Sequence, residues 1–303
     1  MAGDSKKVIY AALFGNGFIA ITKFAAAAMT GSSAMLSEGV HSLVDTGNQG
    51  LLLFGLKRAA KPADDRHPFG YGAELYFWAF VVAILIFSIG AGISIYEGIH
   101  KVQHPEIVTN AWVNYVVLAV AMLFEGAATF VAFREFVKTK GDYSYIQALK
   151  RSKNPAIFTV LFEDSAAMLG LVIAFIGLFL AQTLNMPIFD GIASIAIGVV
   201  LAITAIFLAY ETKGLLIGEA ATPENRAIIE EIISEAKGIT NVNGIITLHL
   251  GPDEILVNAS LDFEDKLSAA MVEKITAKLT QKLQLHVPSV KRIFIEAKSW
   301  SDA

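Results

Sequence analysis

Six long apolar segments constrain this chain more than any other feature of its sequence. Each reaches or approaches the ~20 residues that an α-helix needs to cross a bilayer. The segments cover residues 8–30, 33–56, 74–99, 111–135, 157–182 and 187–209. The composition agrees, because 54% of the 303 residues are hydrophobic and only 17% are charged, which is too apolar for an ordinary soluble protein. The sequence therefore predicts an α-helical polytopic membrane protein with six transmembrane helices.

Positive charge is distributed unevenly over the connections between these segments. The connection between the second and third segments carries Lys57, Arg58, Lys61 and Arg66, and residues 138–153 carry five further lysines and arginines. The opposite connections are nearly free of positive charge. By the positive-inside rule this asymmetry predicts that both termini are cytoplasmic. No cleavable signal or targeting peptide is evident, so a bacterial inner membrane is the simplest location.

The sequence pattern changes after residue 213. Amphipathic runs at 223–237 and 267–283 predict two helices. Residues 245–250, 255–263 and 290–297 predict three strands. We therefore expect residues 1–213 to form a six-helix transmembrane domain. Residues 214–303 should form a small cytoplasmic α+β domain of the ferredoxin-like type, with a role in dimerisation or regulation.

Cysteine content and charge exclude several classes of function. The chain has no cysteine, which excludes disulfides and thiolate metal sites. Its formal net charge is -4, and the acidic excess lies in the C-terminal part. This balance argues against a nucleic-acid partner and mildly favours cations as ligands.

A polar stripe interrupts the second apolar segment. His41 and Asp45 are four residues apart, so they lie on one face of a helix, and Glu38 and Asn48 fall on the same stripe. Titratable groups at membrane depth are costly to bury, which makes them functional candidates. The structural alternative is that His41 donates to a backbone carbonyl while Asp45 pairs with Lys23.

A second acidic position, Glu163-Asp164, interrupts the fifth segment. One imidazole nitrogen with two or three oxygens around a dehydrated cation suits a divalent transition metal such as zinc. Additional oxygen ligands would favour manganese, iron(II) or magnesium. We therefore predict an intramembrane metal site that contains His41, Asp45 and Asp164. The same groups bind protons, so metal and protons would exchange at such a site.

Three further polar residues lie in apolar segments. Lys23 is either the partner of an intramembrane acid or a side chain that snorkels toward the outer face. Glu125 is either a proton relay or neighbour of the metal site, or a capped structural acid. Asp190 is expected to cap the N-terminus of the sixth helix.

Several motifs match a known family. These are His41-x-x-x-Asp45, the run Asp64-Asp-Arg-His67-Pro-Phe-Gly-Tyr71 before the third segment, and Asp190-Gly in the sixth. The chain resembles the cation diffusion facilitators, which export divalent metals from the cytosol. It is similar to the branch of zinc transporter 9 in the runs His41-Ser-Leu-x-Asp45-Thr-x-Asn48, Glu125-Gly-Ala and Leu161-x-Glu163-Asp164.

The fourth ligand of the predicted metal site departs from the family pattern. The family pairs two ligands of the second span with His-x-x-x-Asp in the fifth. Here Asp164 matches the aspartate, but Val160 stands in place of the histidine. Asn48, Glu163 or water could fill this position. Glu163 and Asp164 are about 100° apart around a helix, so we rank Asn48 ahead, because it shares the face of the second-span ligands.

Two other metal sites of the family are altered in this chain. In the loop before the third span, Asp64 and His67 match the acid and the first histidine, whereas Tyr71 replaces the other histidine. This loop is either a weak ion site or a turn capped by the aspartate. In the C-terminal domain, Ser260 and Glu296 occupy positions that are histidine-rich in some relatives. We therefore expect that domain to serve dimerisation rather than metal sensing.

The resemblance implies a homodimeric, proton-coupled antiporter that exports a divalent transition metal, with zinc favoured, by alternating access. Manganese, iron(II) or cobalt as the substrate, and a non-transporting metal-sensing protein, are the alternatives. We expect no enzymatic activity, since the HExxH motif of metal hydrolases is absent. We also expect no resident cofactor. The expected partners are the transported metal ion and protons, membrane lipid and a second copy of the chain.

Overall fold

The computed structural model describes residues 2–140, 143–145, 147–148 and 152–299, so part of the predicted positive connection 138–153 lies outside the described residues. The chain forms two compact units. The first comprises the chain up to Lys57 together with Phe77–Thr212, and the second comprises Arg58–Tyr76 together with the chain from Lys213 onward. The expected domain boundary at residue 213 lies beside this division, but the connection 58–76 groups with the second unit.

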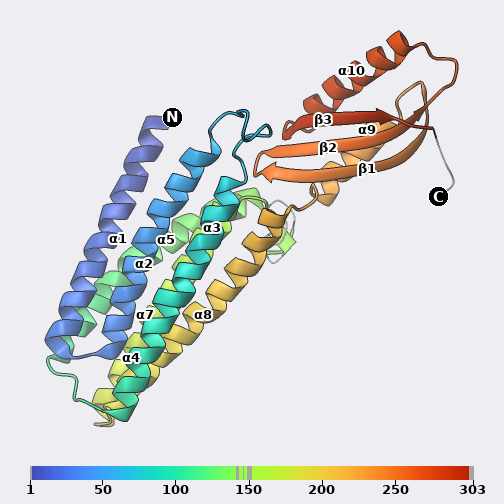
Figure 1. Ribbon diagram of the computed structural model, residues 1–303. Helices are drawn as coiled ribbons and strands as arrows, with labels where there is room; N and C mark the ends of the chain where they lie inside the picture. The colour runs from blue at the N-terminus through green and yellow to red at the C-terminus, as the bar shows by residue number, and fades with distance from the viewer. Residues whose placement is uncertain (1, 141–142, 146, 149–151, 300–303) are drawn as a thin grey trace. The chain divides into compact units, whose positions relative to one another are not determined.

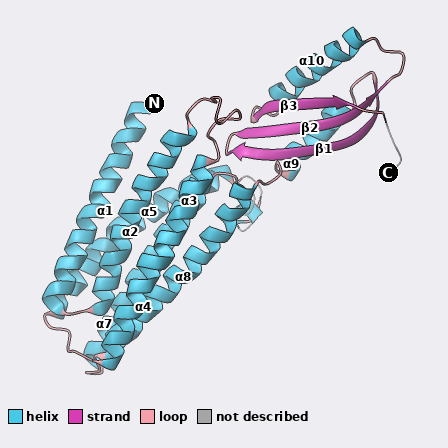
Figure 2. Ribbon diagram, viewed as in Figure 1, coloured by secondary structure: helices cyan, strands magenta, loops and turns pink. Residues whose placement is uncertain are grey.

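The first unit is built from long helices (Figures 1 and 2). Each of the six predicted apolar segments is helical. The third segment contains a short π-helix, η1, which the sequence did not predict. The elements are α1 (Ala2–Thr30), α2 (Ser33–Ala59), α3 (Glu74–Leu85), η1 (Ile86–Ala91), α4 (Gly92–Gln103), α5 (Ala111–Thr139), α7 (Pro155–Thr183) and α8 (Ile188–Ile217).

Four helical stretches among the described residues are long and apolar enough to cross a membrane. They are Glu74–Gln103, Ala111–Val131, Phe158–Thr183 and Ile188–Ile217. The first two predicted spans, α1 and α2, are not among these four. In α2 the buried residues Glu38, His41 and Asp45 lower the hydropathy. The expected class, a helical membrane domain with a small α+β domain after it, is confirmed.

Gly98 allows the backbones of α4 and α8 to pack in direct contact. A Cβ atom at Gly98 would lie 2.7 Å from both the carbonyl oxygen of Gly191 and the backbone nitrogen of Ile195. Because these are backbone atoms, they could yield only if the helices moved apart. The Ser194 hydroxyl adds a hydrogen bond to the carbonyl of Ser94, at 2.7 Å. Small residues and polar contacts of this kind hold helices together where lipid surrounds them.

Asp190 joins α8 to the N-terminus of α2. Its fully buried carboxylate accepts hydrogen bonds from the Ser32 hydroxyl (2.6 Å), from the Ser33 N–H (2.7 Å) and from the Ser33 hydroxyl (3.1 Å). Asp190 is the third residue of its own helix, α8. The prediction that it caps the sixth helix is therefore wrong, because its oxygens cap α2 instead. A negative charge at this end of α2 also complements the helix dipole.

The second unit contains a three-stranded sheet and two helices. In sequence order they are α9 (Pro223–Ser234), β1 (Ile239–Gly251), β2 (Glu254–Phe263), α10 (Ala269–His286) and β3 (Val290–Ala297). The strand order is β1-β2-β3, with β1 antiparallel and β3 parallel to the central β2. The helices start at caps, since Thr222 accepts from the N–H of Asn225 and Ser268 accepts from that of Met271.

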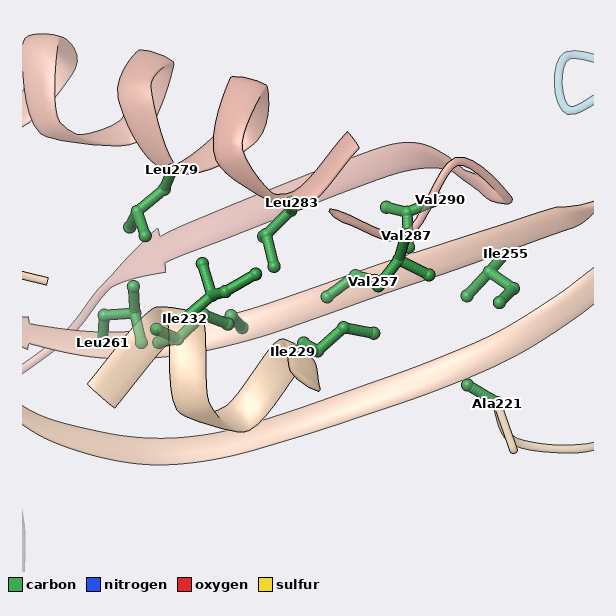
Figure 3. Close-up of a cluster of buried hydrophobic side chains, with 12 residues drawn as sticks. Ala221, Ile229, Ile232, Ile255, Val257, Leu261, Leu279, Leu283, Val287 and Val290 are labelled. Carbon is green, nitrogen blue, oxygen red and sulfur yellow. The ribbon is translucent and has the colours of Figure 1, made fainter. Parts of the chain in front are cut away.

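The core of this unit lies between the two helices and the sheet. Figure 3 shows side chains of α9 and α10 directed toward those of the central strand β2. Fully burying one such side chain contributes about 1.5–3 kcal/mol relative to leaving it exposed. The fully or almost fully buried members include Ile229 and Ile232 of α9, Leu279 and Leu283 of α10, and Val257 and Leu261 of β2.

Candidate metal centre

The centre of α2 carries polar atoms that are buried and without hydrogen bonds. His41 and Asp45 are only 1% and 7% exposed, and the His41 Nδ1 atom lies 3.4 Å from the Asp45 Oδ1 atom. Both ring nitrogens of His41 and the Oδ1 of Asp45 lack a hydrogen-bond partner. The alternative in which His41 donates to a backbone carbonyl is therefore wrong. Such buried atoms cost free energy unless something binds to them.

One turn further along α2, Asn48 contacts α7. The Asn48 Nδ2 atom donates to the Glu163 Oε1 atom at 2.8 Å, and both side chains are buried. The Asn48 carbonyl oxygen, Oδ1, has no hydrogen-bond partner. Asn48 and Glu163, which were weighed as alternatives for the fourth ligand, therefore lie next to each other. Their direct hydrogen bond joins two helices that are far apart in the sequence, so no local spacing rule predicts it.

The remaining acids lie nearby but do not complete a ligand shell. Glu125 of α5 and Asp164 of α7 lie close to each other, since the Thr129 hydroxyl donates to the Glu125 carbonyl at 2.7 Å and lies 3.5 Å from the Asp164 carbonyl. Asp164 is only partly buried, whereas Glu125, on α5, is 5% exposed. Across the described residues, no set of three histidine, aspartate, glutamate or cysteine side chains is close enough to hold a metal ion. The expected ligands therefore lie on α2 and α7, which are in contact through Asn48 and Glu163, but they do not surround a common position. The ligand set stays a prediction.

Lys23 is buried beside this region. It is 0% exposed, and its Nζ atom donates to the Glu38 Oε2 atom at 2.9 Å and to the Ser42 hydroxyl at 2.7 Å. The interpretation that Lys23 snorkels to the surface is therefore wrong, and its acidic partner is Glu38 rather than Asp45. Ser42 was missed, although its spacing of four residues from Glu38 places both on one helix face.

The loop between α2 and α3 is a hydrogen-bonded turn. Asp64 accepts from the backbone N–H of Arg66 (3.0 Å) and of His67 (2.8 Å), and from the Tyr71 hydroxyl (2.6 Å). The Tyr71 hydrogen bond and the backbone donors lower the pKa of Asp64, and the same bond raises the pKa of Tyr71. Since the Asp64 oxygens are used in this way, the loop fits the capped turn better than the weak ion site of Asp64 and His67.

Ser260 and Glu296 lie on neighbouring strands of the second unit. Ser260 of β2 pairs directly with Glu296 of β3 in the parallel register. His249 is buried on β1, with its Nδ1 atom 3.1 Å from the carbonyl oxygen of Gly251.

Comparison with known proteins places the chain in a family. A family model described as the cation efflux transmembrane domain matches residues 9–217. The human proton-coupled zinc antiporter SLC30A9, mitochondrial, is 31% identical over 86% of this chain and 46% of its own length. Metal tolerance protein C4 of Arabidopsis thaliana is 29% identical over 87% of this chain and 58% of its own length.

A bacterial relative matches at lower identity. The cation-efflux pump FieF of Escherichia coli is 24% identical over 86% of this chain and 81% of its own length. The chain spans about half the length of the human relative. The matched family domain covers α2 and α7, which carry the buried polar atoms described above. The chain therefore belongs to the cation efflux family, the cation diffusion facilitators, and is related to zinc transporter 9.

Proposed function

We propose that this protein exports a divalent transition metal in exchange for protons, and that His41 and Asp45 are the central ligands of the transported ion. The observation that carries the proposal is the set of buried atoms without partners: two imidazole nitrogens and one carboxylate oxygen one helical turn apart. These are the donor types that bind zinc and its neighbours. The similarity to a zinc antiporter and to a cation-efflux pump supports the same activity.

Proton exchange follows from the chemistry of these donors. A metal ion needs a neutral imidazole and ionised carboxylates, so protonation of the same groups favours release of the metal. Asp164 and Glu163 would complete the site from α7, with Asn48 as the neighbouring amide ligand. Glu125 would pass or hold protons beside them. Rocking of helices around this site would expose it to each face in turn.

The identity of the metal depends on the donors from α7. Zinc is our first choice, and an oxygen-rich shell that includes Asn48 and Glu163 would favour manganese, iron(II) or cobalt. We further propose that both termini lie in the cytosol, as the positive connections favour, and that the protein works as a homodimer. One relative is described as mitochondrial, so an energised organellar membrane is a second candidate beside the bacterial inner membrane.

Flux in proteoliposomes tests this function. We expect the unmodified chain to move zinc with opposite movement of protons, as reported by a metal-sensitive dye and a pH-sensitive dye. Changing both His41→Ala and Asp45→Ala should abolish the two signals together. Ser165→Ala is the matched control, because this exposed hydroxyl of α7 bonds only to its own helix, at the Leu161 carbonyl. Unchanged fluxes in the double variant would refute the ligand assignment.

The same assay identifies the metal. Zinc, manganese, iron(II) and cobalt are compared in parallel, first with the unmodified chain and then with Val160→His. Restoring an imidazole on α7 should shift the preference toward zinc, because nitrogen donors suit zinc better than manganese. An identical preference in both proteins would show that position 160 does not face the transported ion.

A further inference from the structure

A buried ion pair joins α1 to α2 close to the proposed metal site. The Lys23 ammonium donates to the Glu38 carboxylate at 2.9 Å and to the Ser42 hydroxyl at 2.7 Å. All three side chains are 2% exposed or less. We call them the Lys23 cluster. The proposed ligands do not require this ion pair, and ionisable groups at membrane depth are rarely without function.

The Lys23–Glu38 pair lies on the turn side of the metal site, since Glu38 precedes the proposed ligand His41 by three residues, whereas Ser42 directly follows His41. With a rise of ~1.5 Å per residue, Glu38 lies roughly 8 Å and Asp45 roughly 18 Å from Ser33 along α2. On the other side of the turn, Lys23 lies seven residues before the end of α1 at Thr30. A cation that moved from Asp45 toward the turn side of the bundle would therefore pass the Lys23–Glu38 pair.

The cluster is tightly enclosed by three helices. The Glu38 Oε1 atom fits against Gly170 of α7, where an added Cβ would overlap with it, and the Phe24 ring of α1 packs on Gly39 of α2. Because the Lys23 ammonium and the Glu38 carboxylate are in contact, their opposite charges largely cancel, and closure of the route depends on the packed helices that this pair holds together. The ion pair and the packing thus close the same route.

Beyond the cluster, on the turn side, there is open space. A pocket of about 440 Å³ is lined by Phe24 and Leu36, which are one residue from Lys23 and two from Glu38, by Glu97 and His100 of α4, and by Glu106 in the connection after α4. This pocket lies beside the cluster on the turn side, and its lining mixes apolar and polar side chains.

We propose that Lys23 and Glu38 form a closed gate on the turn side of the metal site. The metal ion passes only when α1 and α2 separate far enough to break the Lys23–Glu38 pair. Breaking it leaves two buried charges without partners, so the closed state is favoured until water reaches them. The proposal rests on the proposed transport function, since it assigns a gate to that site.

Cysteine accessibility tests the gate directly, because the chain contains no cysteine of its own. The reporter is Asn48→Cys, which lies on the far side of the cluster from the turn. Membrane-impermeant thiol reagent is added separately to each face of reconstituted vesicles. Lys23→Met and Glu38→Gln remove the charges while keeping the volume of the side chains. Thr22→Ala is the matched control, because this hydroxyl bonds only to the carbonyl of Ile19 in its own helix.

We expect Lys23→Met and Glu38→Gln each to raise the labelling rate from the turn side by at least tenfold, with the opposite face unchanged. The exchanged pair, Lys23→Glu with Glu38→Lys, should return labelling toward its original rate. Unchanged turn-side labelling would overturn the proposal. An equal increase from both faces would also overturn it, since that result indicates a loosened bundle. Labelling needs no metal flux, so a chain that fails to transport zinc refutes the proposed function without deciding the gate.

Discussion

The buried carboxylate of Asp190 allows a sharp test of how α2 is held. It accepts three hydrogen bonds at the start of α2, from the Ser32 hydroxyl and from the N–H and hydroxyl of Ser33. Asp190→Asn keeps the shape of the side chain but removes the charge and replaces one acceptor by an NH2 group. Hydrogen bonds to charged groups contribute about 1.5–3 kcal/mol each. Since the Ser33 donors lie against one oxygen, we expect a loss of about 2–4 kcal/mol in unfolding free energy.

A double-mutant cycle assigns this loss to the contact with α2. The free energy of unfolding is measured in detergent micelles for Asp190→Asn, Ser33→Ala and the double variant. The two changes remove parts of one interaction, so we expect a coupling energy above about 0.5 kcal/mol. Thr46→Ala is the control partner, because Thr46 lies 13 residues further along α2 and its hydroxyl bonds to the Ser42 carbonyl. Its effect should add to that of Asp190→Asn.

Additive effects of Asp190→Asn and Ser33→Ala on the unfolding free energy would refute the assignment of Asp190 to α2. If Asp190 capped its own helix α8, as the sequence pattern suggests, then Ser33→Ala would be independent of Asp190→Asn. Coupling within about 0.5 kcal/mol of zero would support that interpretation. A loss of less than about 1 kcal/mol in unfolding free energy for Asp190→Asn alone would also contradict the structure, because replacing a fully buried carboxylate that accepts three hydrogen bonds should cost more.

Three further changes test the packing and the loop. Gly98→Ala should lower the unfolding free energy by about 1–3 kcal/mol, because its Cβ would meet backbone atoms of α8 at 2.7 Å, whereas Gly47→Ala, with nothing within 4 Å, should not destabilise. Leu283→Ala should cost about 2–5 kcal/mol by opening a cavity in the core of the second unit, seen as a lower midpoint for its unfolding. Hydrogen bonds lower the pKa of Asp64, so they stabilise the loop at pH values above the ordinary pKa of an aspartate, and this stabilisation is lost as the pH falls through the lowered pKa. Amide hydrogen exchange in the loop should accelerate as this carboxylate becomes protonated. Tyr71→Phe removes one of the hydrogen bonds and should therefore move the acceleration to higher pH.

The fold was largely predictable because its signals are local. Long apolar runs and helical or alternating periodicity predicted the helices of the first unit and the elements of the second. The departures come from contacts between distant parts of the chain. The strand β1 begins at Ile239, six residues before its apolar pattern, because it pairs with β2 as far as Phe263. The connection 58–76 belongs to the second unit for a similar reason: Phe69, for example, packs edge-on against Phe294.

The candidate site was predictable only within one helix. The spacing of His41 and Asp45 places them together on any helix. No such rule pairs Lys23 with Glu38, because their meeting depends on how α1 and α2 pack across a turn. The same limit explains why Asp190 was assigned to the wrong helix. Residues four apart are constrained by the backbone, whereas residues 15 or 157 apart are constrained only by the assembled bundle.

Val160, where the family resemblance led us to expect a histidine, lies close to the contact between α2 and α7. Glu163 follows Val160 by three residues, so it lies on nearly the same face of α7, one turn further along. Asn48 follows Asp45 by three residues on α2 and reaches Glu163 with a hydrogen bond of 2.8 Å. The two helices therefore meet through an amide and a carboxylate, whereas the family resemblance led us to expect an imidazole on α7. Such an exchange replaces a nitrogen donor by oxygen donors, and oxygen donors bind harder ions relatively better.

If Asn48 and Glu163 are ligands, Glu163→Gln should weaken zinc and manganese transport together. If they only fasten α2 to α7, Glu163→Gln, which retains an oxygen acceptor for Asn48, should leave the metal preference and the flux nearly unchanged.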